Sequence, residues 1–258
     1  MKKKKTWKRF LHFSSAALAA GLIFTSAAPA EAAFWGASNE LLHDPTMIKE
    51  GSSWYALGTG LTEERGLRVL KSSDAKNWTV QKSIFTTPLS WWSNYVPNYT
   101  KTSGRRTSNT ITASTGYIIP FLLLEAIHLP LVLASSTSIS SGGWKDEGLV
   151  IRSTSSNNYN AIDPELTFDK DGNPWLAFGS FWSGIKLTKL DKSTMKPTGS
   201  LYSIAARPNN GGALEAPTLT YQNGYYYLMV SFDKCCDGVN STYKIAYGRS
   251  KSITVLLS

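Results

Sequence analysis

A short sequence unit that occurs three times constrains the fold more than any other feature of the chain. Each copy has a carboxylate beside a proline, a strand-like run, a glycine-containing turn and a second strand-like run. The copies occupy residues 43–57, 162–178 and 215–230. Two short apolar or aromatic runs around such a turn are typical of a β-hairpin. The chain is therefore predicted to be built from repeated hairpins.

A weaker repeat follows these hairpins, and long helical periodicity is scarce. An apolar strand leads into a serine-rich turn in Leu67 to Ser73, Leu131 to Ser138, Ile185 to Leu190 and Tyr243 to Ser252. Four short strands per unit at a regular period predict an all-β propeller, whose radial sheets place equivalent strand ends around one central channel. Carboxylates on different units would then converge on one axis.

The number of repeat units can be estimated from the intervals between the repeated carboxylates. Asp44 and Asp163 are 119 positions apart, whereas Asp163 and Glu215 are 52 apart, so one whole unit is expected in the first interval. Its carboxylate should fall at about residue 107. A fifth unit would begin beyond about residue 265, past Ser258, so the C-terminal blade is expected to be absent.

Residues 100–132 should form the missing unit, but they fit the pattern poorly. The stretch 103–107 (Ser-Gly-Arg-Arg-Thr) has no carboxylate, and the apolar runs 117–124 and 129–133 lack an Asn-Gly turn. Two interpretations stay open. The segment is a real insertion that forms a hydrophobic lid or partner surface, or it is a compensated frameshift, because shifted codons for Ser-Gly-Arg-Arg-Thr can encode Trp-Ala-Pro-Asp.

Residues 1–32 are predicted to be a secretory signal peptide, which leaves 33–258 as one propeller domain. A basic run from Lys2 to Arg9 precedes an apolar stretch at 16–24 and then small residues, which is the order that a signal peptide requires. The apolar stretch is well short of the ~20 residues of a membrane span. We therefore expect a secreted, extracellular protein with no membrane segment in its mature form.

Net charge argues against a nucleic-acid-binding protein, and cysteine content argues against a domain built on a disulfide framework. Six of the 27 basic and one of the 18 acidic residues lie in the leader, so the net charge falls from +9 to +4 without it, and nucleic-acid binding loses its support. Cys235 and Cys236 are adjacent and are the only cysteines. They cannot link distant segments; a vicinal disulfide and two free thiols both stay open.

Aromatic residues make up 12% of the chain, which suits carbohydrate binding and β-sheet cores equally.

The carboxylates of the repeat suit the hydrolysis of a glycosidic bond. An acid must protonate the leaving oxygen while a second carboxylate acts on the opposite face of the sugar, and their environments must differ. Glu215 lies in an apolar run that suits a protonated acid, whereas Asp44 follows His43 in a polar setting that suits a base. Asp163 could orient Glu215 and keep it protonated by repulsion. The structural alternative is that each Asp-Pro only starts a turn.

At these residues the chain resembles family 43 of the glycoside hydrolases, which are five-bladed propellers that cut arabinans and xylans by inversion. The resemblance covers residues 34–99 and 133–254. It rests on motifs that occur in order: Leu-His-Asp-Pro-Thr at 42–46, Asn-Ala-Ile-Asp-Pro-Glu at 160–165, Gly-Ser-Phe-Trp-Ser-Gly-Ile at 179–185, Leu-Glu-Ala-Pro-Thr at 214–218 and Ser-Phe-Asp-Lys-Cys-Cys-Asp-Gly at 231–238. The last is similar to the secreted bacterial endo-α-1,5-L-arabinanases. The resemblance implies an all-β, five-bladed β-propeller, here incomplete, with an aberrant second blade and no fifth.

The resemblance also implies a role for each site residue. Asp44 would be the general base, Glu215 the general acid and Asp163 the group that tunes and orients the acid. Aromatic faces stack on sugar rings and short polar side chains meet sugar hydroxyls, although ordinary strand packing would also explain the aromatic residues. Substrate contact is implied for Asp44, Asn160, Asp163, Ser180, Phe181 and Trp182.

Partner, cofactor and function follow from the same resemblance. The expected substrate is arabinan, bound by a monomer, and the possible cofactor is calcium near a fifth-blade histidine, with no metal ligand assigned in this chain. The predicted function is endo-hydrolysis of α-1,5-L-arabinofuranosidic bonds by an inverting acid/base mechanism. The alternatives are an exo-acting arabinofuranosidase or xylosidase of the same clan, a non-catalytic carbohydrate-binding propeller and an inactive truncated product. An open propeller would expose sheet edges, which predicts poor folding and weak activity.

Overall fold

The computed structural model describes residues 40–59, 66–87, 89–95, 111–113, 116–122 and 129–255. The predicted leader, 1–32, and the stretch 103–107 lie outside these residues. No helix in the part of the chain so described is both long and apolar enough to cross a membrane.

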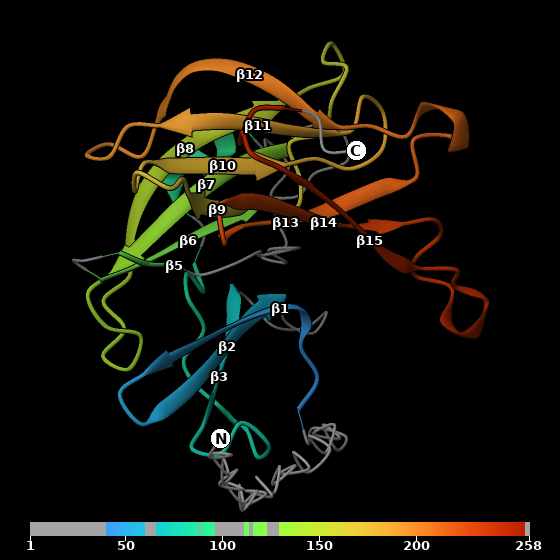
Figure 1. Cartoon of the computed structure of the whole chain (residues 1–258). Helices are drawn as coiled ribbons and strands as arrows, with labels where there is room; N and C mark the ends of the chain where they lie inside the picture. The colour runs from blue at the N-terminus through green and yellow to red at the C-terminus, as the bar shows by residue number, and fades with distance from the viewer. Residues whose placement is uncertain are drawn as a thin grey trace, which may run out of the picture. The chain divides into compact units, whose positions relative to one another are not determined.

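The described residues form four antiparallel sheets in which strands adjacent in sequence are also adjacent in space (Figure 1). The first sheet contains β1 (His43–Glu50), β2 (Ser53–Thr59), β3 (Leu67–Ser72) and β4 (Thr79–Val80). The second contains β5 (Ile111–Ala113), β6 (Gly116–Leu122), β7 (Leu129–Ser136) and β8 (Lys145–Ser153). The third contains β9 (Glu165–Phe168), β10 (Pro174–Phe178), β11 (Ile185–Leu190) and β12 (Pro197–Ala205). The fourth contains β13 (Leu214–Gln222), β14 (Tyr225–Phe232) and β15 (Lys244–Ser250).

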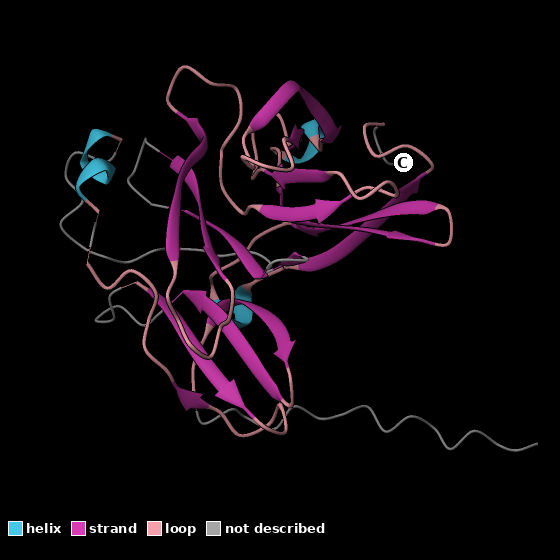
Figure 2. Cartoon of the chain, turned by 90° about the vertical axis from the view of Figure 1, so that its left-hand side faces the viewer, coloured by secondary structure: helices cyan, strands magenta, loops and turns pink. Residues whose placement is uncertain are grey.

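Helical structure among these residues is limited to short 3-10 turns, which Figure 2 shows between the strands. They are η1 (Ser90–Asn94), η2 (Pro208–Asn210) and η3 (Gly238–Asn240). The predicted all-β class is therefore confirmed. The order of strands within each sheet is a meander, which is the sheet topology of a propeller blade.

The predicted Asn-Gly hairpin is confirmed between β13 and β14. Asn223 and Gly224 are its only two loop residues, and their φ angles are 49° and 83°. A two-residue hairpin loop with both residues at positive φ suits the right-handed twist of the strands, and Asn-Gly adopts it most readily.

The segment that fits the sequence repeat poorly nevertheless takes part in a sheet. β6 pairs with β7 from Tyr117↔Ser136 to Leu122↔Leu131, and β7 pairs with β8 from Leu129↔Ser153 to Ser135↔Lys145. Leu131, Val132 and Leu133 are fully buried. The interpretation of this segment as a hydrophobic lid or partner surface is therefore wrong for Leu131, Val132 and Leu133, because their side chains lie in the core.

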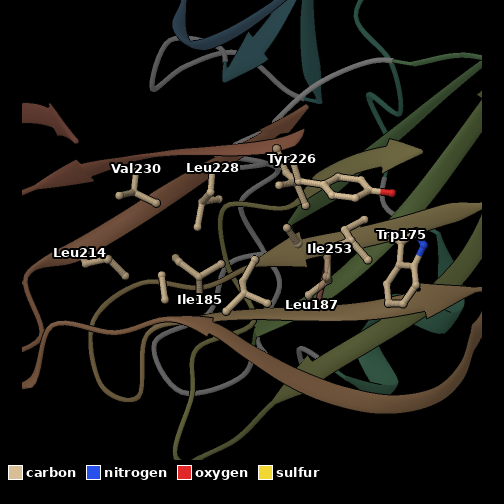
Figure 3. Close-up of a cluster of buried hydrophobic side chains, with 12 residues drawn as sticks. Trp175, Ile185, Leu187, Leu214, Tyr226, Leu228, Val230 and Ile253 are labelled. Atoms are coloured by element: carbon tan, nitrogen blue, oxygen red, sulfur yellow. The ribbon is translucent and has the colours of Figure 1, made fainter. Parts of the chain in front are cut away.

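Hydrophobic clusters join each sheet to the next one in sequence. Tyr55 and Leu57 of the first sheet pack with Val132 of the second, and Leu133 on the other face of the second packs in a cluster with Phe178 of the third. Figure 3 shows the cluster between the third and fourth sheets, where Ile185, Leu187 and Trp175 meet Leu214, Tyr226, Leu228 and Val230. Truncating one fully buried leucine to alanine in such a core costs about 2–5 kcal/mol.

Candidate functional site

Each of the three repeated prolines follows a residue in the left-handed backbone region. The φ angles are 48° at Asp44, 52° at Asp163 and 53° at Ala216. Positive φ is uncommon outside glycine, and such strained residues cluster at functional sites. The sequence repeat is thus also a repeat of backbone conformation. However, in the third copy the left-handed residue is Ala216, one position after Glu215.

The strand register places Glu215 at the position of His43 and not of Asp44. In the first and fourth sheets an irregularity follows His43 and Glu215, and pairing resumes three residues later, at Thr46 and Thr218. The prediction that the three carboxylates are strictly equivalent is therefore wrong by one residue at Glu215. The reason is that the proline and the bulge, and not the charged residue, set the register of the strand.

Glu215 is buried, and hydroxyl groups contact both of its carboxyl oxygens. Its exposed fraction is 4%. The Ser180 hydroxyl donates to Oε2 at 2.6 Å, and the Tyr243 hydroxyl donates to Oε1. A buried carboxyl group needs such partners, because a polar group without them costs free energy. The two hydroxyls therefore fix the orientation of Glu215.

Backbone contacts hold Ser180 against the start of β13. Ser180 and Glu215 form an antiparallel bridge, and the Phe181 amide donates to the Leu214 carbonyl at 2.8 Å. The Asn160 side-chain amide donates to the Ser180 carbonyl at 2.9 Å. Asn160, Ser180, Glu215 and Tyr243 are therefore one hydrogen-bonded group, which we call the Glu215 cluster.

Asp163 lies close enough to this cluster for its charge to act on Tyr243. Asp163 is 5% exposed. Burial raises the pKa of the Tyr243 hydroxyl well above its ordinary value, and the hydrogen bond to Glu215 and the charges of Glu215 and Asp163 raise it further, against a smaller lowering by Ser231. Tyr243 therefore stays protonated and keeps donating throughout the ordinary pH range.

Asp44 lies in a different environment, in the first sheet. Its side chain is 33% exposed, and Nδ1 of His43, itself 65% exposed, lies 2.7 Å from its Oδ2. The structure thus connects Asn160, Ser180 and Glu215 through hydrogen bonds and Asp163 through its charge. That Asp44 shares one pocket with them stays a prediction.

Phe181 and Trp182 lie in the loop between β10 and β11 and not within a strand. Their exposed fractions are 37% and 55%, and both have left-handed φ angles, 54° and 48°. Ordinary strand packing therefore does not explain them. Gly212 faces this loop, and a Cβ at that position would lie 3.0 Å from the Trp182 amide nitrogen. Glycine thus lets the two loops approach closely.

Sequence reasoning missed Tyr243 as a site residue. It was recognised only as the first residue of an apolar strand, because it belongs to no carboxylate motif. Its contact with Glu215 spans 28 positions of the chain. No local pattern marks such a pair, and only the pairing of β14 with β15 brings Tyr243 near.

Two further predictions concern cysteines and metal ions. Cys235 and Cys236 form a disulfide, so the oxidised form is the one that the structure contains. Within the described ranges, no group of three or more His, Cys, Asp and Glu side chains is arranged to bind a metal ion. Calcium stays a prediction from resemblance, and no chemical step below involves it.

Comparisons with known proteins agree on one family. The family described as "Glycosyl hydrolases family 43" matches residues 38–255. The chain is 87% identical over 254 residues to "Extracellular endo-alpha-(1->5)-L-arabinanase 1" of Bacillus subtilis (strain 168), covering 98% of this chain and 79% of that protein. Native Bacillus subtilis arabinanase Arb43A is structurally similar, with 82% identity, a TM-score of 0.77 and coverage of 85% of this chain and 76% of that one. The GH43 endo-arabinanase from Bacillus licheniformis has 60% identity, a TM-score of 0.79 and coverage of 84% and 74%.

Proposed function

The chain belongs to family 43 of the glycosyl hydrolases, and from this premise we propose that it is an extracellular endo-α-1,5-L-arabinanase that hydrolyses arabinan. The observation that carries the proposal is the 87% identity over 98% of the chain to a protein named for that activity. The buried Glu215 cluster supports it, because a glycosidase needs a positioned acid. The exo-acting and non-catalytic alternatives have less support, because this relative is named an endo-acting enzyme.

We also propose that the four sheets are blades of a five-bladed propeller. Each sheet is a meander, and consecutive sheets share hydrophobic clusters as radial blades do. The closure of the ring and the number of blades belong to this proposal. It further includes cleavage of the leader after residue 32, which sequencing of the mature N-terminus tests.

In the proposed mechanism Glu215 donates its proton to the glycosidic oxygen as the bond to the anomeric carbon breaks. Asp44 accepts a proton from a water molecule that attacks this carbon from the opposite face, so the configuration inverts. This geometry requires about 6.5–9.5 Å between the two carboxyl groups. Asp163 orients the acid through its charge and its proximity to the Glu215 cluster.

Ser180 and Tyr243 have a specific role in this step. When Glu215 loses its proton, negative charge develops on the two oxygens that already accept hydrogen bonds from these hydroxyls. Donors aimed at developing charge need no reorganisation during the reaction, so they stabilise the transition state. We therefore assign Ser180 and Tyr243 as positioning residues for the acid.

The test of the function is a product profile on linear, debranched arabinan. An endo-acting enzyme lowers the viscosity of the solution early and releases oligosaccharides before arabinose, and NMR of the new reducing ends shows inversion. Release of arabinose alone from the first time point would identify an exo-acting enzyme instead. Binding to arabinan without any product would identify a carbohydrate-binding module, and xylan serves as the control substrate.

A further inference from the structure

A pocket of about 520 Å³ lies between the first and second sheets. One of its walls is the stretch 81–87, which follows β4, and the other is the stretch 139–144 in the β7–β8 loop. Its floor consists of four buried side chains, Tyr55, Val69, Ile84 and Ile139. We call it the Trp144 pocket. Its volume falls within the range of about 300–1,000 Å³ that is usual for small-ligand sites.

The wall that the β7–β8 loop forms lies at the far end of β1 from Asp44. The Glu50 carboxylate accepts hydrogen bonds from the backbone amides of Ile139 at 2.9 Å and of Ser140 at 3.0 Å. Glu50 is the last residue of β1, and Asp44 is its second. Six residues of a strand span about 20 Å, so this wall is about 20 Å from the proposed base. No residue of the Glu215 cluster lines the pocket, which is therefore separate from the proposed catalytic carboxylates.

Two aromatic side chains, Phe85 and Trp144, each belong to a different wall of the pocket. Both are partly buried and pack on the hydrophobic cluster between the two sheets. The Phe85 ring also meets Trp92 edge to face, with ring centroids 5.9 Å apart. Such packing holds each ring in place while part of it stays accessible. Aromatic rings offer large apolar faces, and a sugar ring can stack its C–H face on them.

The polar groups of the pocket are almost all uncharged. Gln81 contributes an amide, and five residues of the two walls contribute hydroxyl groups, namely Ser83, Thr86, Thr87, Ser140 and Ser141. Lys82 is the one charged side chain among the described residues that line the pocket. An ionic ligand would therefore find little charge to pair with. A neutral, hydroxyl-rich ligand fits better, because each hydroxyl of the protein can both donate and accept a hydrogen bond.

Hydrogen bonds hold both walls in place. In the first sheet, Ile84 exchanges two backbone hydrogen bonds with Leu67, each of 2.9 Å. In the β7–β8 loop, the Ser136 hydroxyl donates to the Ser138 carbonyl at 2.8 Å, and the Ser141 amide donates to the Ser138 hydroxyl at 3.2 Å. A site that is ordered before binding loses little further entropy when a ligand binds.

We propose that the Trp144 pocket is a second, non-catalytic binding site for arabinofuranosyl residues of linear arabinan. The inference rests on the proposed function for the identity of the polymer, and it goes beyond that function because no step of hydrolysis takes place in this pocket. A polymer that occupies both the pocket and the catalytic site is held at two points, so binding at one raises its effective concentration at the other. A short oligosaccharide occupies only one site at a time. The pocket therefore favours the polymer over short oligosaccharides as substrate.

Steady-state kinetics on debranched arabinan and on arabinotetraose test this proposal. Trp144→Ala should raise KM for arabinan about fivefold, without changing kcat for arabinan or kcat/KM for arabinotetraose. Trp54→Ala is the matched control and should affect neither substrate, because Trp54 is also partly buried but lies on the opposite face of the first sheet. Thr86→Arg brings a long, charged side chain to the pocket from an exposed position. It should raise KM for arabinan as Trp144→Ala does, without removing a packed side chain.

Two kinetic results would overturn the second site. The first is a parental KM for arabinan in a Trp144→Ala variant whose melting temperature is unchanged. The second is an equal loss on arabinan and on arabinotetraose, since it would mean that the substitution acts on the catalytic site. Should Trp144→Ala melt at a lower temperature, Thr86→Arg decides by the same comparison.

A binding measurement separates the second site from the proposed function. If the parent hydrolyses neither arabinan nor arabinotetraose, the proposed function fails. Electrophoresis of Glu215→Gln in a gel that contains debranched arabinan measures binding without turnover, and adding Thr86→Arg should reduce the retardation by the polymer. Retardation that is absent, or that Thr86→Arg leaves unchanged, overturns the second site whether or not the parent is active.

Discussion

The neighbourhoods of Glu215 and Asp44 have the same backbone but opposite surroundings. Both lie at a strand irregularity before a proline. Glu215 is 4% exposed and receives hydrogen bonds from two hydroxyls, whereas the Asp44 side chain is 33% exposed and contacts the neighbouring His43. An acid that must hold its proton suits the buried position, and a base that must stay ionised suits the more exposed one.

The irregularity offers two successive positions, and the first and fourth sheets use different ones for their carboxylates. The fourth sheet has Glu215 at the first position and Ala216 at the second. The first sheet has His43 at the first and Asp44 at the second. One backbone motif can therefore present a carboxylate in two ways, and this difference explains how the repeat supplies groups with different roles.

The largest predicted effect tests the two roles directly. Glu215→Gln and Asp44→Asn should each lower kcat on arabinan by about 10²–10⁴-fold, because each removes a proton-transfer group. On an aryl arabinofuranoside with an acidic phenol as leaving group, Glu215→Gln should recover most of its activity, because this group departs without a proton. Asp44→Asn should stay inactive, because the attacking water still needs a base.

Steady-state kinetics on both substrates check this prediction, with Asp171→Asn, at an exposed turn, as the control. Rescue of Asp44→Asn, and not of Glu215→Gln, by the activated leaving group would exchange the two roles. Equal loss on both substrates in both variants would refute the assignment of Glu215 as the acid and Asp44 as the base.

The carboxylates themselves could be predicted from the sequence, whereas their register could not. Asp44, Asp163 and Glu215 each lie within two residues of a proline in a repeated local motif. They can therefore be recognised from the sequence alone. The left-handed conformation at Ala216 leaves no mark in the sequence, because alanine rarely adopts it. Tyr243 was missed for a related reason, since its role arises only from strand pairing.

In the second sheet the repeated sequence pattern is missing, but the strands form. The segment 100–132 has no repeated carboxylate and no Asn-Gly turn, so it does not match the sequence repeat. Nevertheless, β6 and β7 form there and Leu131 is fully buried. Turn chemistry is one route to a strand pair, but apolar residues that can be buried against neighbouring sheets are sufficient.

The next prediction concerns the hydroxyl that distinguishes the Glu215 neighbourhood. Tyr243→Phe should lower kcat on arabinan about tenfold to hundredfold and leave KM nearly unchanged, because a donor to a charged group contributes about 1.5–3 kcal/mol. Because its raised pKa keeps Tyr243 protonated, the parent should show no alkaline loss from this residue below about pH 10.

Full pH–rate profiles of kcat and kcat/KM check this prediction, with Tyr247→Phe as the matched control. Tyr247 is on the same strand, β15, but is 76% exposed. A Tyr243→Phe variant with parental kcat would remove Tyr243 from the positioning residues. An equal loss in Tyr247→Phe would point to a general effect on β15.

A smaller effect is expected at the other oxygen of Glu215. Ser180→Ala should lower kcat about threefold to tenfold, less than Tyr243→Phe, because Asn160 and the Phe181 amide still hold the loop in place. The Ser180→Ala/Tyr243→Phe double variant should lose less or more than the product of the single losses, because both donors act on one carboxyl group. Strict additivity in a double-mutant cycle would show that the two hydroxyls act independently.

The smallest effect is expected on the exposed side of the comparison. His43→Gln removes the group beside Asp44, and because both side chains are partly exposed, their contact is worth about 0.2–1 kcal/mol. Activity on arabinan should therefore fall no more than about fivefold. A loss as large as that of Tyr243→Phe would mean that His43 orients Asp44 as firmly as the two hydroxyls orient Glu215. The two carboxylates would then not differ in how tightly their neighbours hold them.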